Sequence, residues 1–158
     1  MILKGIIDTD TINYKKISMV LEFPICKNFK CDRECGRQVC QNSALATAPD
    51  IEVNPADIVQ RYINNSITEA VCIQGMEPFD SIVDLLTFIF IFRSISDDDI
   101  VIYTGYTKCE IADDVEELKN YPNIIIKYGR YVPDQEPHYD EVLGVYLASD
   151  SQYAEKIS

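Results

Sequence analysis

Four of the six cysteines of this chain fall within one short stretch, at Cys26, Cys31, Cys35 and Cys40. Thiolate sulfur is a soft ligand that selects zinc, copper(I) or iron–sulfur clusters. The chain opens without the charged-then-apolar pattern of a secretory signal, so we expect a reducing cytoplasm, where cysteines bind metal more readily than they form disulfides. The stretch from Phe23 to Asn42 is therefore a candidate metal-binding loop.

The spacing of these cysteines favours an iron–sulfur cluster over zinc. Structural zinc sites usually combine two closely spaced cysteine pairs with a longer insert between them, and the four cysteines here are evenly spaced. A cluster held by three cysteines leaves one iron open to a substrate, whereas a cluster held by four serves mainly in electron transfer. The cysteines by themselves leave both arrangements open.

Composition limits the classes of partner. The 158 residues are 47% hydrophobic, which is typical of a soluble globular chain, and we expect one domain over residues 1–158. A formal net charge of −12 predicts that nucleic acid is not a partner. The apolar run Ile82–Phe92 is too short to span a bilayer, so we expect no membrane insertion. Lysine and arginine are in excess only near the cysteines, which suits an anionic cluster, an anionic ligand or an acidic redox partner.

The segments that must position the cysteines read as alternating strands and helices. Runs of β-branched and aromatic residues predict strands at 17–23, 69–73, 99–103 and 123–128. Asn54 and Pro55 are start signals for a helix over 55–63, Asp80 is the expected cap of a helix over 81–94, and a short acidic helix is expected around 115–119. Residues 1–16 are an extension of uncertain role, and residues 129–141 read as irregular. This order predicts an α/β fold with a parallel sheet.

In a parallel sheet of this kind, ligands bind at the carboxyl ends of the strands. The loops that follow Phe23, Ile73 and Tyr103 would all lie at that edge. We therefore expect these three loops to form one site.

The three loops also carry a family resemblance. In chain order they hold Cys40-Gln41-Asn42, Gly75-Met76-Glu77-Pro78 and Tyr103-Thr104-Gly105-Tyr106. This ordered set resembles the radical S-adenosylmethionine (SAM) superfamily, and within it the activating protein of anaerobic (class III) ribonucleotide reductase. The similarity extends from about Ile17 to the end of the chain. It implies a partial (βα) barrel of parallel strands with flanking helices.

The resemblance implies a set of site residues. Cys26, Cys31 and Cys40 would bind a 4Fe–4S cluster, with Cys35 as a spare or alternative ligand. The residues around S-adenosyl-L-methionine would be Gln41, Asn42, Gly75, Met76, Glu77, Pro78, Thr104 and Tyr106. The chain departs from the family in two ways: none of its cysteines reproduce the usual C-x3-C-x2-C spacing, and Met76 stands where the family has a second glycine. The set Cys31, Cys35 and Cys40 is a competing assignment.

The resemblance also implies an activity and partners. A radical SAM activase would reductively cleave SAM and install a glycyl radical on the catalytic subunit of anaerobic ribonucleotide reductase, with a low-potential electron donor such as flavodoxin. This chemistry requires no side-chain acid or base, so we expect His138 to be a surface or packing residue, Cys72 a buried apolar residue and Cys109 incidental. The alternatives are a radical SAM enzyme with another substrate and a non-enzymatic iron–sulfur or zinc protein that uses all four clustered cysteines.

Overall fold

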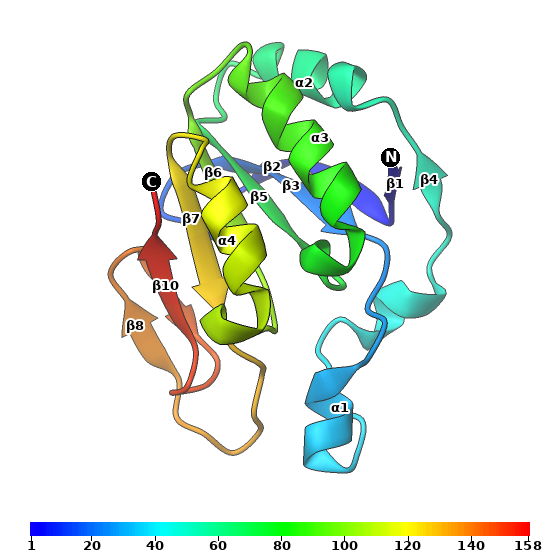
Figure 1. Ribbon diagram of the computed structural model, residues 1–158, viewed down its shortest axis with the longest axis vertical. Helices are drawn as coiled ribbons and strands as arrows, with labels where there is room; N and C mark the ends of the chain where they lie inside the picture. Colours follow the sequence, from blue (N-terminus) through cyan, green and yellow to red (C-terminus); the bar gives the residue numbers. More distant parts are fainter.

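A six-stranded mixed sheet forms the centre of the computed structural model, which describes residues 1–158 (Figure 1). The strand order across the sheet is β10-β7-β6-β5-β3-β2. The four central strands are parallel: β3 (Ser18–Phe23), β5 (Ala70–Gly75), β6 (Asp99–Tyr103) and β7 (Ile124–Tyr128). The edge strands β2 (Gly5–Asp10) and β10 (Tyr153–Lys156) pair antiparallel to their neighbours.

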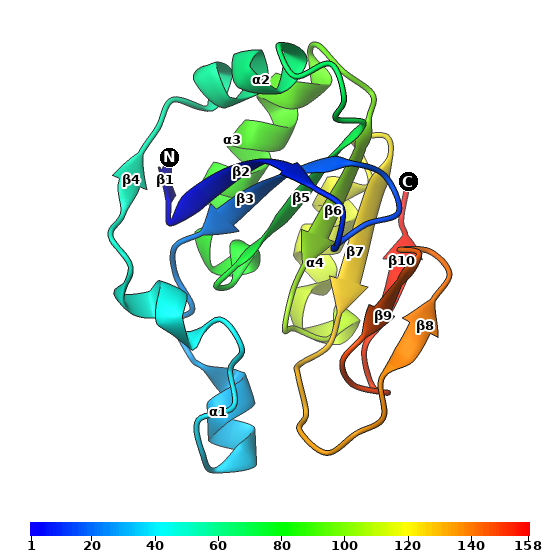
Figure 2. The same cartoon turned by 180° about the vertical axis from the view of Figure 1, so that it is seen from behind.

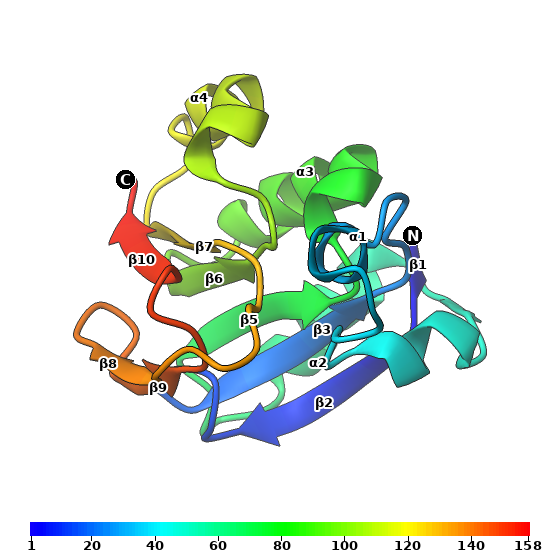
Figure 3. The same cartoon turned by 90° about the horizontal axis from the view of Figure 1, so that it is seen from below.

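All three long helices pack on one face of the sheet, and Figure 3 shows α3 (Ile82–Arg93) and α4 (Ala112–Leu118) on that side. They are α2 (Pro55–Ile63), α3 (Ile82–Arg93) and α4 (Ala112–Leu118), and each lies in the connection between two adjacent parallel strands. Their apolar side chains join alternate residues of the central strands in a core cluster of 22 buried residues. Burial of this cluster is the main stabilising contribution on that face.

The opposite face is covered by a hairpin and by the loop before β3. The hairpin strands are β8 (His138–Asp140) and β9 (Val145–Leu147), seen beside β10 in Figure 2. Tyr14, Leu143 and Leu147 pack there against the other set of alternate strand residues, which includes Cys72. Both faces of the central strands are therefore buried, as their continuous apolar sequences predict.

The connection from β3 to α2 carries the cysteines and lies at the carboxyl end of the sheet, where α1 projects from the body of the molecule (Figure 1). It holds α1 (Lys30–Cys35) and the 3₁₀ helix η1 (Ser43–Thr47). Two further 3₁₀ helices, η2 (Pro78–Ser81) and η3 (Lys108–Ile111), precede α3 and α4, and the short strands β1 (Ile2–Leu3) and β4 (Ile51–Glu52) pair with each other. No helix combines the length and the apolar composition that a membrane span requires.

The predicted α/β class is confirmed, and the four predicted strands match β3, β5, β6 and β7. The predicted parallel pairing of these four strands is confirmed, two further strands that were not predicted add antiparallel edges, and the six strands form an open mixed sheet rather than a full barrel. Residues 1–16, whose role the sequence left uncertain, supply β1 and the edge strand β2. The segment expected to be irregular contains β8.

Of the two helix caps predicted from the sequence, the one at α2 is confirmed and the one at α3 is wrong. Asn54 caps α2 as predicted, since its side-chain oxygen accepts a hydrogen bond from the backbone N–H of Ala56 at 3.0 Å. Asp80 does not cap α3, which begins at Ile82 after a 3₁₀ turn. The Asp80 carboxylate instead accepts hydrogen bonds from Lys27 N at 2.6 Å and from the Tyr106 hydroxyl at 2.9 Å. A tertiary contact with residues 23–42, called the cysteine loop below, therefore replaces the local cap.

Candidate functional site

A cavity of about 350 Å³ lies at the carboxyl ends of the parallel strands. The loops after β3, β5 and β6 all contribute to its wall, as the sequence predicted. The end of β7, the loop before β3 and the segment of the hairpin around Tyr146 complete it. An α/β sheet binds ligands at this edge, so the cavity is the candidate functional site.

Three of the four clustered cysteines line this cavity. They are Cys26, Cys31 and Cys40, while Cys35 lies outside the wall at the end of α1. Asp32 shapes the return of the loop, because its carboxylate accepts hydrogen bonds from the backbone N–H groups of Val39 and Cys40 at 2.7 and 2.8 Å. The segment after α1 therefore leads the chain back to the cavity at Cys40, whereas Cys35 lies at the end of α1, away from the cavity.

The environment of the three thiols favours their neutral form in the ligand-free protein. Burial raises the pKa of Cys26, Cys31 and Cys40, and the backbone amides of Phe29, Tyr131 and Asn42 partly oppose this rise. No group of three or more His, Cys, Asp or Glu side chains is arranged to hold a single metal ion. The thiolate ligands of a multinuclear cluster bind separate irons and so need not converge on one point.

Two main-chain hydrogen bonds and one from the side chain of Asn42 join the turn after β5 to the end of β3 and to the cysteine loop. Met76 N donates to Phe23 O at 3.0 Å, Glu77 N donates to Ile25 O at 2.8 Å, and the Asn42 amide donates to Gly75 O at 2.6 Å. Gly75 has a φ of +97°, and a Cβ placed on it would lie 2.7 Å from Phe23 N. The close approach of the two loops therefore requires glycine at this position.

Glu77 joins the loops after β5 and β6. Its carboxylate is buried and accepts hydrogen bonds from Thr104 Oγ1 at 2.7 Å, Gly105 N at 2.9 Å and Phe79 N at 3.2 Å. Burial raises the pKa of Glu77 to about 7, although these three hydrogen bonds act to lower it. Glu77 makes no ion pair, so its charge is matched only by neutral donors.

A row of three polar side chains on neighbouring strands borders the cavity. Gln74, Tyr103 and Lys127 occupy matching positions of β5, β6 and β7 and lie on the face opposite the helices. Burial lowers the pKa of Lys127 to about 8, against the opposing effect of Cys31 and Glu77. The sequence-based site missed Lys127, although one signal was present: it is the only charged residue in the strand Ile-Ile-Ile-Lys-Tyr.

The structure brings together most of the predicted SAM contacts. The residues that line the cavity are Gln41, Asn42, Gly75, Met76, Glu77 and Thr104. Pro78 and Tyr106 are outside its wall: Pro78 begins η2, and the Tyr106 ring lies under the Lys30 ammonium group, 4.8 Å from it. The site predicted from sequence did not include the wall formed by Tyr131, Gln152 and the segment 145–148.

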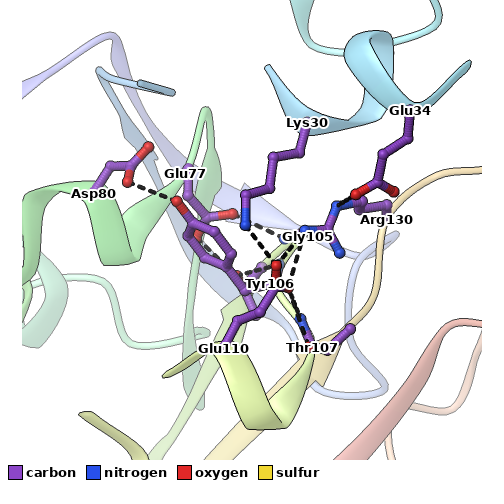
Figure 4. A network of polar contacts seen from close by, with 10 residues as sticks. Lys30, Glu34, Glu77, Asp80, Gly105, Tyr106, Thr107, Glu110 and Arg130 are labelled. Carbon is purple, nitrogen blue, oxygen red and sulfur yellow. Dashed lines mark hydrogen bonds and ion pairs between the residues drawn. The ribbon is translucent and has the colours of Figure 1, made fainter. Parts of the chain in front are cut away.

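Ion pairs hold α1, the helix that carries Cys31 and Cys35, against the rest of the site (Figure 4). Glu110 of η3 pairs with Lys30 at 2.5 Å and with Arg130 at 2.7 Å, and Arg130 Nε lies 3.1 Å from Glu34 of α1. The helix α1 has no buried residue. Its position therefore depends on charges rather than on apolar packing, and Glu110 is the centre of the network.

Glu110→Gln is expected to make α1 more mobile without unfolding the protein. The variant should speed amide hydrogen exchange in residues 27–42 several-fold while it changes global stability by about 1 kcal/mol or less, because the ion pairs are partly exposed. Hydrogen bonding to Arg130 lowers the pKa of Glu110 from its ordinary 4.5, so the contribution is complete above that pH and is lost as the pH falls further.

The matched control is Glu116→Gln, which removes an exposed ion pair to Lys119 at 2.5 Å elsewhere on the surface. This control should leave exchange in residues 27–42 unchanged. Equal exchange rates in Glu110→Gln and the unaltered protein would show that the network does not hold α1.

Comparison of the chain with protein-family models, with curated proteins and with solved structures gave no match. We therefore infer the function from the sequence motifs and from the geometry of the cavity.

Proposed function

We propose that this chain is a radical SAM activase that installs a glycyl radical on anaerobic ribonucleotide reductase. The observation that carries the proposal is the convergence of three cysteines with the Gly75–Glu77 turn on one cavity, while the fourth clustered cysteine stays outside it. A site that combined an open iron with a cosubstrate would need this division. A site built only for electron transfer would have no need of the turn.

The arrangement of helices also supports a radical SAM type of partial barrel. Four parallel strands stand in the chain order β3, β5, β6 and β7, and their crossover helices all cover one face. The other face is left for the cavity and the hairpin. This is how part of a (βα) barrel is organised, with helices outside and the site at the carboxyl ends of the strands.

The donor set fits a 4Fe–4S cluster with three protein ligands. Cys26, Cys31 and Cys40, which are half-buried in the wall of the cavity, would hold it. When bound, the cluster would supply the electron that cleaves a carbon–sulfur bond of SAM. Metal binding would require the three thiols to lose their protons, so it should weaken as the pH falls.

The protein's own residues would position the cosubstrate. Glu77 is fixed by three hydrogen bonds, and the resemblance places the amino group of SAM at this turn. Asn42 holds the carbonyl of Gly75 and so links the cysteine loop to the same turn. These contacts fix the wall before a ligand binds, which limits the entropy lost on binding.

The surface of the cysteine loop is compatible with an acidic electron donor such as flavodoxin. Lys27, Arg33 and Arg37 are exposed, and of these Arg37 lies 3.6 Å from Asp134; Asp32 accepts hydrogen bonds from backbone N–H groups, and Glu34 pairs with Arg130. The patch is positive although the chain as a whole carries −12. Opposite charges would steer such a donor toward the cysteines.

The product assay that tests this proposal is direct. Anaerobically reconstituted, reduced protein is incubated with SAM, with and without an anaerobic ribonucleotide reductase, and the products are separated by chromatography. We expect 5′-deoxyadenosine and methionine in equal amounts, and a stable radical on the reductase. Absence of both products would contradict the activase. Products without a radical on the reductase would favour a radical SAM enzyme with another substrate.

A further inference from the structure

The hairpin strand β9 has one free edge, and that edge faces the cavity. β9 pairs only with β8, and no main-chain hydrogen bond of residues 145–148 runs to another segment. β9 is the inner strand of the hairpin, since its residues line the cavity and those of β8 do not (Figures 2 and 3). Successive side chains of a strand point to opposite faces, yet all four residues 145–148 border the cavity. The strand therefore meets the cavity along its backbone edge.

This edge carries none of the features that protect other sheet edges from further pairing. Proteins commonly protect an edge strand with charged side chains, proline or a bulge. The edge strand β2 has Asp8, Asp10 and an irregular register with β3, and β10 ends in Glu155 and Lys156. Residues 145–148 read Val-Tyr-Leu-Ala, without a charge, a proline or a bulge. The edge of β9 is therefore open to a further strand.

The surroundings of this edge favour an uncharged occupant. Tyr146 is 73% exposed and Ile12, from the loop before β3, is 75% exposed, and both line the cavity. Tyr139 of β8 packs edge-on against Tyr146, with the ring centroids 5.5 Å apart. The charged side chains of the wall, Glu77 and Lys127, come from the loop after β5 and from β7, not from the hairpin. A segment that lies along β9 would therefore meet apolar side chains and main-chain groups and no charge.

We propose that β9 binds an extended, uncharged segment of a partner protein as an additional strand. Main-chain hydrogen bonds would hold this segment, as they do wherever a peptide joins an exposed sheet edge. Alternate residues of the segment would face the cavity, and the others would lie beside Tyr146 on the outer surface. Such a site recognises its partner mainly by the backbone.

The inference deepens the proposed function and rests on it for the identity of the partner. The acceptor of a glycyl radical is a backbone Cα, and glycine offers no side chain for recognition. Pairing with β9 would fix the main chain of the acceptor segment. A glycine at a cavity-facing position would leave no side chain between its Cα and the cavity. The added strand is therefore the segment of the reductase that carries the acceptor glycine.

The test uses a short synthetic peptide that spans the acceptor glycine of an anaerobic ribonucleotide reductase. Two analogues carry N-methyl groups on alternate amides, one at odd and one at even positions, so each lacks the N–H donors of one edge. Binding to the anaerobically reconstituted protein is measured by fluorescence anisotropy. Because only one edge of an added strand pairs with β9, one analogue should bind on the order of 10-fold more weakly than the unmethylated peptide, and the other within about 2-fold of it.

Amide hydrogen exchange and two matched variants locate the contact. The peptide should slow exchange in residues 145–148 several-fold and leave exchange in β2, the far edge of the main sheet, unchanged. Tyr146→Lys places a charge beside the added strand and should weaken peptide binding by about 3- to 5-fold. Tyr139→Lys is the control, because it breaks the same ring pair one strand further from the free edge and should leave peptide binding unchanged.

The outcomes distinguish this inference from the proposed function. If the protein cleaves SAM but the two analogues bind equally, or residues 145–148 gain no protection, pairing with β9 is overturned and the activase proposal stands. Equal weakening by Tyr146→Lys and Tyr139→Lys, or failure of the unmethylated peptide to bind, would also overturn it. If one analogue is selectively weakened and residues 145–148 are protected, but no 5′-deoxyadenosine forms, the strand-binding edge stands and the activase proposal fails.

Discussion

Cys26→Ala, Cys31→Ala and Cys40→Ala are each expected to abolish cluster retention, whereas Cys35→Ala is expected to keep the iron content of the unaltered protein. The first three thiols line the cavity and the fourth does not. Loss of a group that only hydrogen-bonds to a metal ligand lowers metal affinity by about 10–100-fold. Loss of a ligand itself should lower the affinity at least as much. The measurement is iron and sulfide content after anaerobic reconstitution and desalting.

Cys109→Ala is the matched control for this series. Cys109 is an exposed thiol in η3, outside the cavity, and its removal should leave the iron content unchanged. Loss of the cluster in Cys35→Ala together with the other three would indicate a four-cysteine site closed to SAM. Loss in Cys35→Ala with retention in Cys26→Ala would select the competing set Cys31, Cys35 and Cys40.

Gly75→Ala is expected to destabilise the protein by about 2–5 kcal/mol and to abolish SAM binding. Two effects add: a positive φ of +97° is unfavourable for alanine, and the new Cβ would lie 2.7 Å from Phe23 N and 2.9 Å from Glu22 C. These neighbours are backbone atoms of β3, so they cannot move aside as a flexible side chain would. Relief would require β3 and β5 to separate at the edge where the site lies.

Gly36→Ala is the control for the conformational part of this cost. Gly36 ends α1 with a φ of +66°, and no atom lies within 4 Å of the Cβ that alanine would add. We expect a loss of about 1 kcal/mol from the left-handed backbone alone. Urea unfolding of the two variants measures the difference, and similar losses in both would show that the approach of β3 to Gly75 is not tight.

The parallel centre of the fold could be predicted from sequence because its signals are local and strong. The strands β3, β5, β6 and β7 are buried on both faces and therefore read as continuous apolar runs. The edge strands β2 and β10 escaped prediction because edges are half-exposed and polar, as in Tyr-Ala-Glu-Lys. Their antiparallel pairing is what makes the sheet mixed.

The site could be predicted only where a motif marks it. The cysteines and the Gly75–Pro78 turn are recognisable as patterns, and most of them line the cavity. Asp80 was misassigned because its partners, Lys27 and Tyr106, are distant in sequence. The position of Lys127 at the cavity depends on the pairing of β7 with β6, which no local pattern records.

Electron paramagnetic resonance of the reduced cluster, recorded with and without SAM, tests the activase proposal most directly. An iron left open by Cys26, Cys31 and Cys40 would bind the cosubstrate, so the spectrum of the reduced protein should change when SAM is added. The same shift should persist in Cys35→Ala. A cluster spectrum that is identical with and without SAM would contradict the proposal and would indicate a closed cluster.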